Sequence, residues 1–471
     1  MKKQAVQLIL LAIILVINTL LTIQPIQSLS IAINKIKATT TTTPQNVQTN
    51  SNVNNAPWTQ VNLNSSQSRF STFDYRHDSF SLILREWSLS AIETSSLVLD
   101  SVGKQLLVLL HPFMKGSDQF EPSAHPTMTL MGAVNLEDGS YSTISQFMLP
   151  AELQENDYDT VMPTPVVDSK GNYFLVRKNI TKGSNVLIKI SPSWKWTTMY
   201  ESDGVMDIMH GLLIFERYGE SSIVLSTSRN IISIDTITKT INFMIPSEQG
   251  YFGQLIRDSN SPYAFASIYG GLIKFELETG IVVTQSRSGA SLVPYHLSSL
   301  KTRMLALSQF RTLDGFMVFA TTFDKNNLTS SSLSIGLTDK ASVCSNAIAT
   351  VGDEFVILCR TKSSNYQLFG LKSKAEDIER TWTLNINSEG AVSQQCSLQI
   401  SVVDTNSRFV SVVCDQSILL VETSKGKIFQ QVNIEDQGSI DEDTQIVAAQ
   451  NNKLYILREK VPRIDAIKIG L

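Results

Sequence analysis

Short apolar or alternating runs, separated by turn residues, recur along most of the chain. Residues 253–285 show the unit of this pattern: they hold four such runs, the first two separated by Asp-Ser-Asn-Ser-Pro and the last two by Glu-Thr-Gly. Runs of this length between Gly, Pro, Asn, Asp and Ser predict one antiparallel sheet of four strands. Such a sheet buries little apolar surface by itself, so we expect further copies to pack against it.

The same pattern returns in groups over most of the remaining chain. The other groups cover residues 95–147, 166–200, 212–244, 303–337, 344–386, 396–434 and 444–469. In the group 303–337 the apolar runs give strands at 303–310, 316–321 and 332–337, and no clear outermost strand. The repetition predicts an all-β fold: a single eight-bladed β-propeller of four-stranded antiparallel blades, with seven blades as the alternative.

The two ends of this array complement each other. The last group ends with its third expected strand, residues 464–469, whereas the strand-like run 81–87 has no partner before the first group. Pairing the two runs would remove the edges that an open array exposes. We therefore expect the N-terminal strand to close the ring.

Length and charge fit this interpretation. A chain of 471 residues accommodates one large propeller, whose repeats take about 40–50 residues each. Charged residues make up 17% of the chain, the formal net charge is −4, and no cluster of Lys and Arg occurs. We therefore expect no nucleic-acid partner, because phosphate binding needs a concentrated basic face.

Residues 1–32 have the features of a targeting segment. Lys2 and Lys3 precede an uncharged apolar run over residues 5–23, and small residues follow it. This predicts a signal peptide, with an uncleaved signal anchor as the alternative, because the run approaches the ~17–25 residues that span a membrane. We expect a secreted or lumenal protein or, with an anchor, a propeller held outside the cytosol.

A low-complexity lead-in separates this segment from the propeller. Residues 33–79 are rich in Thr, Asn, Gln and Ser and are expected to form a flexible linker, and the propeller domain then spans 80–471. Asn64, Asn179 and Asn327 each begin an Asn-x-Ser/Thr sequon. Asn179 and Asn327 fall in expected loops, so we expect an exported glycoprotein.

The four cysteines are placed symmetrically about two expected hairpin turns. Cys344 and Cys359 are equidistant from the turn near residue 352, and Cys396 and Cys414 are centred on residue 405. Residues symmetric about a hairpin turn face each other across the two strands, which predicts the disulfides 344–359 and 396–414. The alternatives are buried free thiols and a four-cysteine zinc site, which the wide spacing disfavours.

Several expected turns share a sequence form. The outer turns 275–280, 234–239 and 421–426 and the inner turn 167–173 resemble the repeats of the quinoprotein alcohol dehydrogenase-like propeller superfamily over about residues 80–471. The resemblance implies a propeller, commonly of eight blades, in a superfamily that includes quinone-cofactor dehydrogenases and non-catalytic scaffolds. The chain lacks the adjacent Cys-Cys pair of the dehydrogenases and most of their closing Trp residues. It therefore looks like the non-catalytic branch, with no catalytic residue and no cofactor predicted.

Known catalytic motifs are missing from the sequence. It contains no G-x-S-x-G, H-E-x-x-H, G-x-G-x-x-G or phosphate-loop pattern, the common signatures of nucleophile, zinc and nucleotide sites. The expected loop 111–125 carries His111, Asp118, Glu121 and His125, which are possible metal ligands. Their spacing matches no zinc motif, so an exposed loop is the favoured interpretation and the metal stays unknown.

Two acidic connections form the other candidate site. Their carboxylates are Asp157, Asp159, Asp441, Glu442 and Asp443. Both connections lead from an outer strand to the next inner strand, so a closed ring would bring them to one face, where they could bind calcium or a basic partner. Solvated loops without a ligand are the simpler alternative.

These patterns predict a binding module rather than an enzyme. We expect an exported propeller that acts as a binding or scaffold module for a protein or glycan partner on its loop face. The alternative is a secreted propeller enzyme, a hydrolase or an oxidoreductase, with its site in the central channel.

Overall fold

The computed structural model divides the chain into two units, residues 1–49 and 50–471. All described residues belong to the second unit. They are the strand residues 82–90, 94–99, 105–110, 128–135, 141–148 and 153–154, and most of 165–469, with gaps mainly at connections. No helix within these described ranges is long and apolar enough to cross a membrane.

The described strands form antiparallel sheets, numbered 1 to 8 along the chain. Sheet 1 consists of β2 (Thr94–Leu99), β3 (Gln105–Leu110), β4 (Met128–Asn135) and β5 (Tyr141–Met148), and sheet 2 of β6 (Leu153–Gln154), β7 (Val166–Val167), β8 (Tyr173–Asn179), β9 (Ser184–Ile190) and β10 (Trp196–Glu201). Sheet 3 consists of β11 (Met209–Arg217), β12 (Glu220–Thr227), β13 (Asn230–Asp235) and β14 (Ile241–Pro246), and sheet 4 of β15 (Phe252–Arg257), β16 (Tyr263–Ile268), β17 (Gly271–Glu276) and β18 (Val282–Arg287).

Sheets 5 to 8 follow the same plan. Sheet 5 consists of β19 (Pro294–Ser299), β20 (Arg303–Thr312), β21 (Gly315–Asp324) and β22 (Ile335–Gly336), and sheet 6 of β23 (Ala341–Cys344), β24 (Ile348–Ala349), β25 (Glu354–Thr361), β26 (Tyr366–Ser373) and β27 (Ile378–Asn385). Sheet 7 consists of β28 (Ser401–Val402), β29 (Phe409–Cys414), β30 (Ser417–Glu422) and β31 (Lys427–Asn433). Sheet 8 consists of β32 (Gln445–Ala449), β33 (Lys453–Arg458) and β34 (Arg463–Ile469), with β1 (Leu82–Ser90) beside β34.

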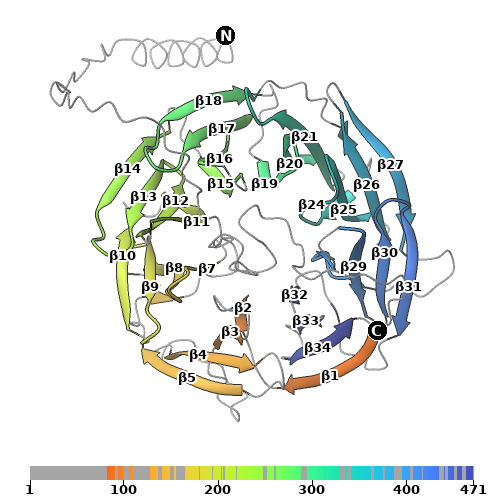
Figure 1. The fold of residues 1–471 in the computed structure, drawn as a ribbon, viewed down its shortest axis with the longest axis horizontal. Coiled ribbons are helices and arrows are strands. Elements are labelled where there is room, and N and C mark those ends of the chain that lie inside the picture. Colours follow the sequence, from red (N-terminus) through yellow and green to blue (C-terminus); the bar gives the residue numbers. More distant parts are fainter. Residues whose placement is uncertain are drawn as a thin grey trace, which may run out of the picture. The chain divides into compact units, whose positions relative to one another are not determined.

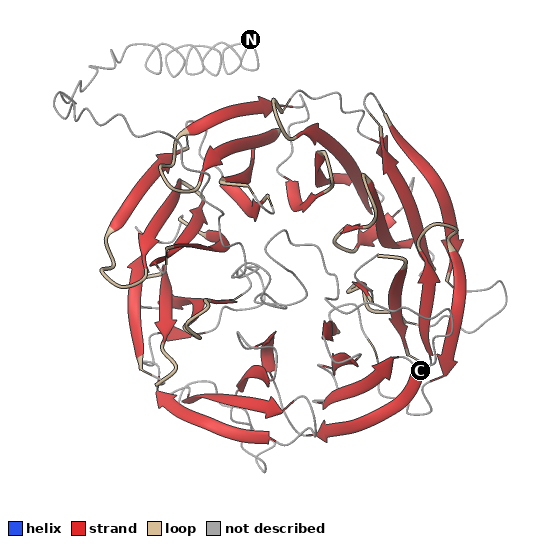
Figure 2. Cartoon of the chain, viewed as in Figure 1, coloured by secondary structure: helices blue, strands red, loops and turns tan. Residues whose placement is uncertain are grey.

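The sheets stand side by side around a common centre, as propeller blades do (Figure 1). The first strand of a sheet, such as β11, β15 or β19, lies nearest the centre, and the last, such as β14, β18 or β27, lies outside. Every described regular element is a strand (Figure 2). The prediction of an all-β fold built from four-stranded antiparallel sheets is therefore correct.

Strands from the two ends of the described chain lie together in sheet 8. β1 pairs antiparallel with β34, so that Leu82 faces Ile469 and Ser90 faces Arg463. The sequence predicted this contact between residues 81–87 and 464–469. The strand continues to Ser90, three residues beyond its expected end.

Sheet 5 differs from its prediction. The run expected as its innermost strand is the second strand, β20, and the innermost strand is β19, which the sequence pattern missed. The sequence Pro-Tyr-His-Leu-Ser-Ser of β19 shows no clear alternation of apolar residues. His296 and Ser298 are nevertheless fully buried. Polar side chains therefore occupy buried positions where the hydrophobic pattern predicts apolar ones. The outermost strand, β22, falls in the run 332–337.

The apolar core lies between neighbouring sheets. One cluster joins sheets 3 and 4 through residues such as Leu213, Val224, Leu255 and Phe275, and similar clusters join sheets 2 and 3, 4 and 5, 5 and 6, and 6 and 7. Sheets 2 to 7 therefore depend on their neighbours for burial.

Four turns before an outermost strand share one geometry. They are Asp235–Lys239, Glu276–Gly280, Asp324–Leu328 and Glu422–Gly426. In each, the backbone N of the fifth residue donates to the carbonyl of the first at 2.9–3.0 Å, and the fifth residue has a positive φ between 52° and 71°. We call these the outer turns. The prediction from sequence found three of them and missed Asp324–Leu328, which has no glycine.

Both cysteine pairs form the disulfides that hairpin symmetry predicts. Cys344 bonds to Cys359 across β23 and β25, with the two Cα atoms 4.0 Å apart. Cys396 bonds to Cys414 at a Cα separation of 3.9 Å. Since disulfides persist in oxidising compartments, both pairs fit an extracellular or lumenal environment.

Candidate functional site

Most of the site residues predicted from sequence lie outside the described residues. These are Asn64, His111, Asp118, Glu121, His125, Asp157, Asp159, Asp441, Glu442 and Asp443. The calcium or partner patch and the His-containing loop therefore stay predictions. Within the part of the chain that the structure describes, no group of three or more His, Cys, Asp or Glu residues could hold a metal ion.

The other two sequon asparagines have opposite environments. Asn179 is the last residue of β8 rather than a loop residue; it is only 8% exposed, and its Oδ1 accepts a hydrogen bond from the Lys182 backbone N. Asn327 lies in an outer turn and is exposed. Its carbonyl accepts a bond from Thr284 Oγ1 at 3.4 Å, which places this turn beside β18.

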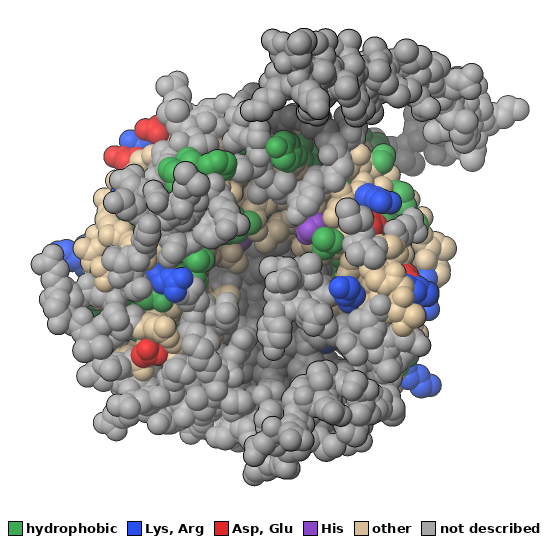
Figure 3. Space-filling view, turned by 180° about the vertical axis from the view of Figure 1, so that it is seen from behind, with side chains coloured by type: hydrophobic (Ala, Val, Ile, Leu, Met, Phe, Trp, Pro, Cys, Tyr) green, Lys and Arg blue, Asp and Glu red, His purple; other side chains and the backbone are tan. Residues whose placement is uncertain are grey.

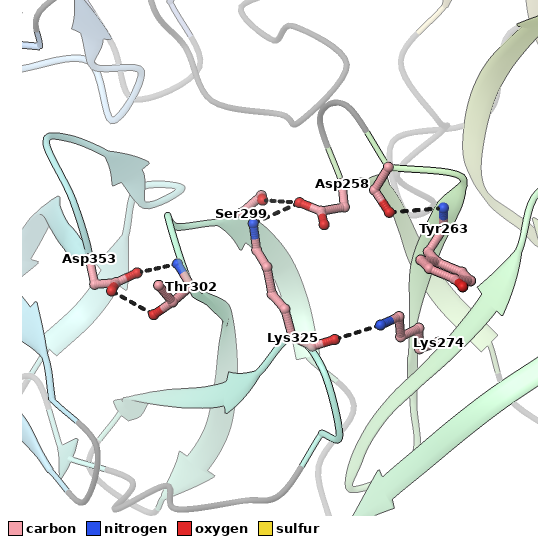
Figure 4. Close-up of polar contacts among 8 residues, drawn as sticks. Asp258, Tyr263, Lys274, Ser299, Thr302, Lys325 and Asp353 are labelled. Carbon is pink, nitrogen blue, oxygen red and sulfur yellow. Dashed lines mark hydrogen bonds and ion pairs between the residues drawn. The ribbon is translucent and has the colours of Figure 1, made fainter. Parts of the chain in front are cut away.

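A chain of polar contacts joins sheets 4, 5 and 6 at the ends of their strands (Figure 4). Asp258 Oδ1 accepts from Lys325 Nζ at 2.7 Å and from Ser299 Oγ at 3.3 Å. Asp353 accepts from both the backbone N and the Oγ1 of Thr302 at 2.7 Å. Protein donors therefore already hold both carboxylates, and the arrangement is suited to locking neighbouring sheets together rather than to binding a cation.

A similar contact joins sheets 2 and 3. Glu216 Oε1 accepts from the backbone N and the Oγ of Ser169 at 2.8 and 2.9 Å. Burial raises the pKa of Glu216, against the effect of these two bonds. In sheet 4, the Arg257 guanidinium lies 5.4 Å from the ring centre of Phe215. Charged groups near the centre thus hold consecutive sheets in place.

A histidine and a serine meet where β11 begins and β12 ends. His210 Nε2 lies 3.0 Å from Ser228 Oγ. Burial lowers the pKa of His210 to about 4, and nearby Asp207 opposes this shift. The imidazole is therefore neutral near pH 7, and in the tautomer with its proton on Nδ1 its Nε2 can accept the serine proton, which is the first requirement of a serine nucleophile. Sequence reasoning missed the pair because the two residues meet only through the register of β11 and β12.

Large apolar side chains are exposed along the outer strands. They include Ile241 (49% exposed) and Met244 (46%) on β14, and Val282 (42%) and Val283 (48%) on β18. Ile237 (64%) and Ile281 (61%) are exposed in the connections before these two strands. On the face drawn in Figure 3, hydrophobic side chains reach the surface in separate places and the charged ones are scattered between them. Apolar groups clustered on an exterior mark a contact surface more often than groups scattered singly do.

The outer strands differ in how they protect their free edges. β27 carries Glu379 and Arg380, both exposed, and Glu379 pairs with Lys374. β14 contains no charged residue. Charges on an edge strand oppose pairing with another chain. The edge at β14 is therefore less protected than the edge at β27.

No protein-family model and no curated protein sequence matches the chain. Solved structures do match its fold. The quinohemoprotein alcohol dehydrogenase of Comamonas testosteroni aligns with a TM-score of 0.54 and 10% identity, over 88% of this chain and 80% of that chain. The C-terminal WD40 domain of Sif2 aligns with a TM-score of 0.51 and 9% identity, over 82% of this chain and 98% of that chain. At these identities the likeness shows the β-propeller fold alone.

Proposed function

We propose that the chain is an exported, closed β-propeller of eight blades that acts as a binding or scaffold module for a partner protein, without catalysis. The pairing of β1 with β34 supports closure, and the two disulfides support export. The likeness to solved propellers supports the fold and carries no activity to this chain.

The exposed apolar edge at β14 is the observation that carries this proposal. Ile241 and Met244 are each about half exposed on a strand without charges. Ile237 is exposed in the turn before this strand, between Asp235 and Lys239. Leaving them in water forgoes hydrophobic stabilisation of roughly 25 cal/mol per Å² of apolar area. An apolar face on a partner protein would cover these side chains and recover that free energy.

Side-chain contact suits this edge better than addition of a long strand. The register between β13 and β14 shifts between Ser233 and Ile234, leaving Asn242 as a bulge, and Pro246 ends the strand without a donor N–H. A bulge and a proline both interrupt the row of backbone groups that an added strand would pair with. The proposed partner therefore presents apolar side chains rather than a long free strand.

Site-specific photo-crosslinking tests this proposal. A photoreactive amino acid at Ile241 is compared with one at Thr383, which is likewise exposed and lies on the charged outer strand β27, in cells that secrete the protein. We expect one discrete adduct from position 241, none from 383, and loss of the adduct when Met244→Lys is added. Equal labelling at both positions, or an adduct that survives Met244→Lys, would contradict the proposal.

The contact between His210 and Ser228 favours a second candidate, a propeller hydrolase. The neutral imidazole could activate the serine hydroxyl as a nucleophile. This alternative makes a distinct prediction, because a binding module does not need a reactive serine.

A further inference from the structure

We propose that Asn327 carries an N-linked glycan that covers the apolar outer edge of β18, and that Asn179 carries none. The sequence offers both asparagines as acceptors, and only their surroundings in the fold distinguish them. The inference rests on the export that the proposed function includes, and does not depend on the proposed partner at β14, since it concerns the edge of sheet 4 and a covalent modification.

Asn179 is enclosed by its own sheet. It pairs with Ser184 on one side and with Leu153 on the other, so its strand is flanked on both sides. Its side chain is buried and its Oδ1 accepts a bond from the Lys182 backbone N in the hairpin turn. A glycan is a bulky, hydrophilic group that needs a path to solvent. A glycan at Asn179 would require the end of this hairpin to open.

Asn327 is presented to solvent by a turn that is itself fixed. Two backbone N–H groups of the turn, those of Asn326 and Asn327, donate to Asp324 Oδ1 at 2.8 and 3.4 Å. Leu328, the fifth residue, is fully buried in the core between sheets 4 and 5. The turn is therefore anchored at both ends while Asn327 stays exposed, which is the geometry a glycan requires.

The same turn lies beside the apolar edge of the preceding sheet. Thr284 Oγ1 donates to the Asn327 carbonyl, and Thr284 directly follows the exposed residues Ile281, Val282 and Val283. Arg287, at the end of β18, is the only charged residue of this strand, so the edge around Val282 and Val283 lacks the protection that charges give β27. A glycan beginning at Asn327 starts next to these side chains and would screen them from other chains.

The outer turn of sheet 4 provides an internal comparison. Its fourth residue, which corresponds to Asn327, is Thr279, and Glu276–Gly280 contains no sequon. That turn lies beside β14, because Phe243 of β14 contacts Gly280. The two edges therefore differ: the β18 edge has a glycan acceptor beside it, and the β14 edge does not.

Glycopeptide mass spectrometry of the full chain secreted from a eukaryotic host tests the site assignment. We expect a glycan at Asn327 in the wild type and in Thr329→Ser, which keeps the sequon, and none in Asn327→Gln or Thr329→Ala. Asn179 should be unmodified in all of them. An unmodified Asn327, or a modified Asn179, would overturn the assignment.

Light scattering of the same proteins tests the role of the glycan. Enzymatic removal of the glycan from the folded wild type should cause concentration-dependent self-association, and Asn327→Gln should behave in the same way. Adding Val283→Lys to Asn327→Gln should restore the monomer, because it places a charge on the β18 edge. A deglycosylated protein that stays monomeric, or association that Val283→Lys does not reduce, would overturn the covering role.

Discussion

The indole of Trp382, on the outer strand of sheet 6, occupies the place where a side chain at Gly426, in the outer turn of sheet 7, would begin. Its Nε1 also donates to the Thr423 carbonyl in that turn at 2.7 Å. Phe243 and Gly280 repeat this relationship between sheets 3 and 4. An aromatic residue of one sheet thus packs onto a glycine of the next. This contact is a second reason for glycine at these positions, in addition to the positive φ.

A residue other than glycine in the left-handed region costs about 1–2 kcal/mol. Gly426→Ala should lower the free energy of unfolding of the domain by more than this backbone cost. The added methyl group displaces Trp382 and strains its hydrogen bond. Gly352→Ala is the matched control, because Gly352 has a φ of 72° and open space around it. Urea denaturation measures both changes. Equal losses of stability would show that the aromatic contact contributes nothing.

Lys239→Gly and Leu328→Gly should shift stability in opposite directions, although both residues occupy the fifth position of an outer turn. Lys239 is exposed at a φ of 61°. Glycine removes a left-handed penalty of about 1–2 kcal/mol and adds an entropic cost of about 0.5–1 kcal/mol, so the net effect should be a stabilisation of about 0.5–1 kcal/mol. Leu328 is fully buried, so its removal should cost about 2–5 kcal/mol through the cavity left behind. Thermal melts of the two variants decide this, and a stabilising Leu328→Gly would contradict the packing described for sheet 5.

His210 should make the protein less stable in mild acid. Its folded pKa of about 4 lies below the ordinary value of 6.5, so between these values the unfolded chain binds more protons. Stability should therefore fall as pH drops from about 6.5 towards 4 and be unaffected by this residue above that window. His210→Gln, which does not titrate, should have a flatter curve of melting temperature against pH. Parallel curves for the two proteins would count against a buried, neutral His210.

Ser228 distinguishes the two candidate functions. If the chain is a binding module, a fluorophosphonate probe should leave the folded protein unlabelled. Stoichiometric labelling that disappears in both Ser228→Ala and His210→Gln would favour a hydrolase instead. Mass spectrometry of the labelled peptide gives the answer, with heat-denatured protein as the control for nonspecific reaction.

Regular alternation is what made most of the fold predictable. The strands of sheet 4 could be predicted because its buried positions hold apolar residues such as Phe265, Leu272 and Phe275 and its turns hold glycine and proline. β19 was missed because it buries His296 and Ser298, which a hydrophobic pattern assigns to the surface. The turn ending at Leu328 was missed because a leucine takes the left-handed position usually held by glycine.

The candidate sites were far less predictable than the fold. The contact between His210 and Ser228 depends on the register of two strands, which no local motif encodes. The exposure of Ile241 and Val283 depends on which outer strands the neighbouring sheets leave uncovered. Both are properties of strand pairing and packing, so sequence spacing alone could not supply them. The cysteine pairs were predictable because each lies within one hairpin.

Closure of the ring by β1 and β34 is most directly tested by truncation and calorimetry. Deleting residues 463–471 removes β34, the partner of both β1 and β33, whereas deleting residues 470 and 471 alone leaves β34 complete. If the ring is closed, the longer deletion should abolish the single thermal transition or lower it by on the order of 10 °C, and the shorter one should leave it in place. An unchanged transition after the longer deletion would contradict a closed propeller.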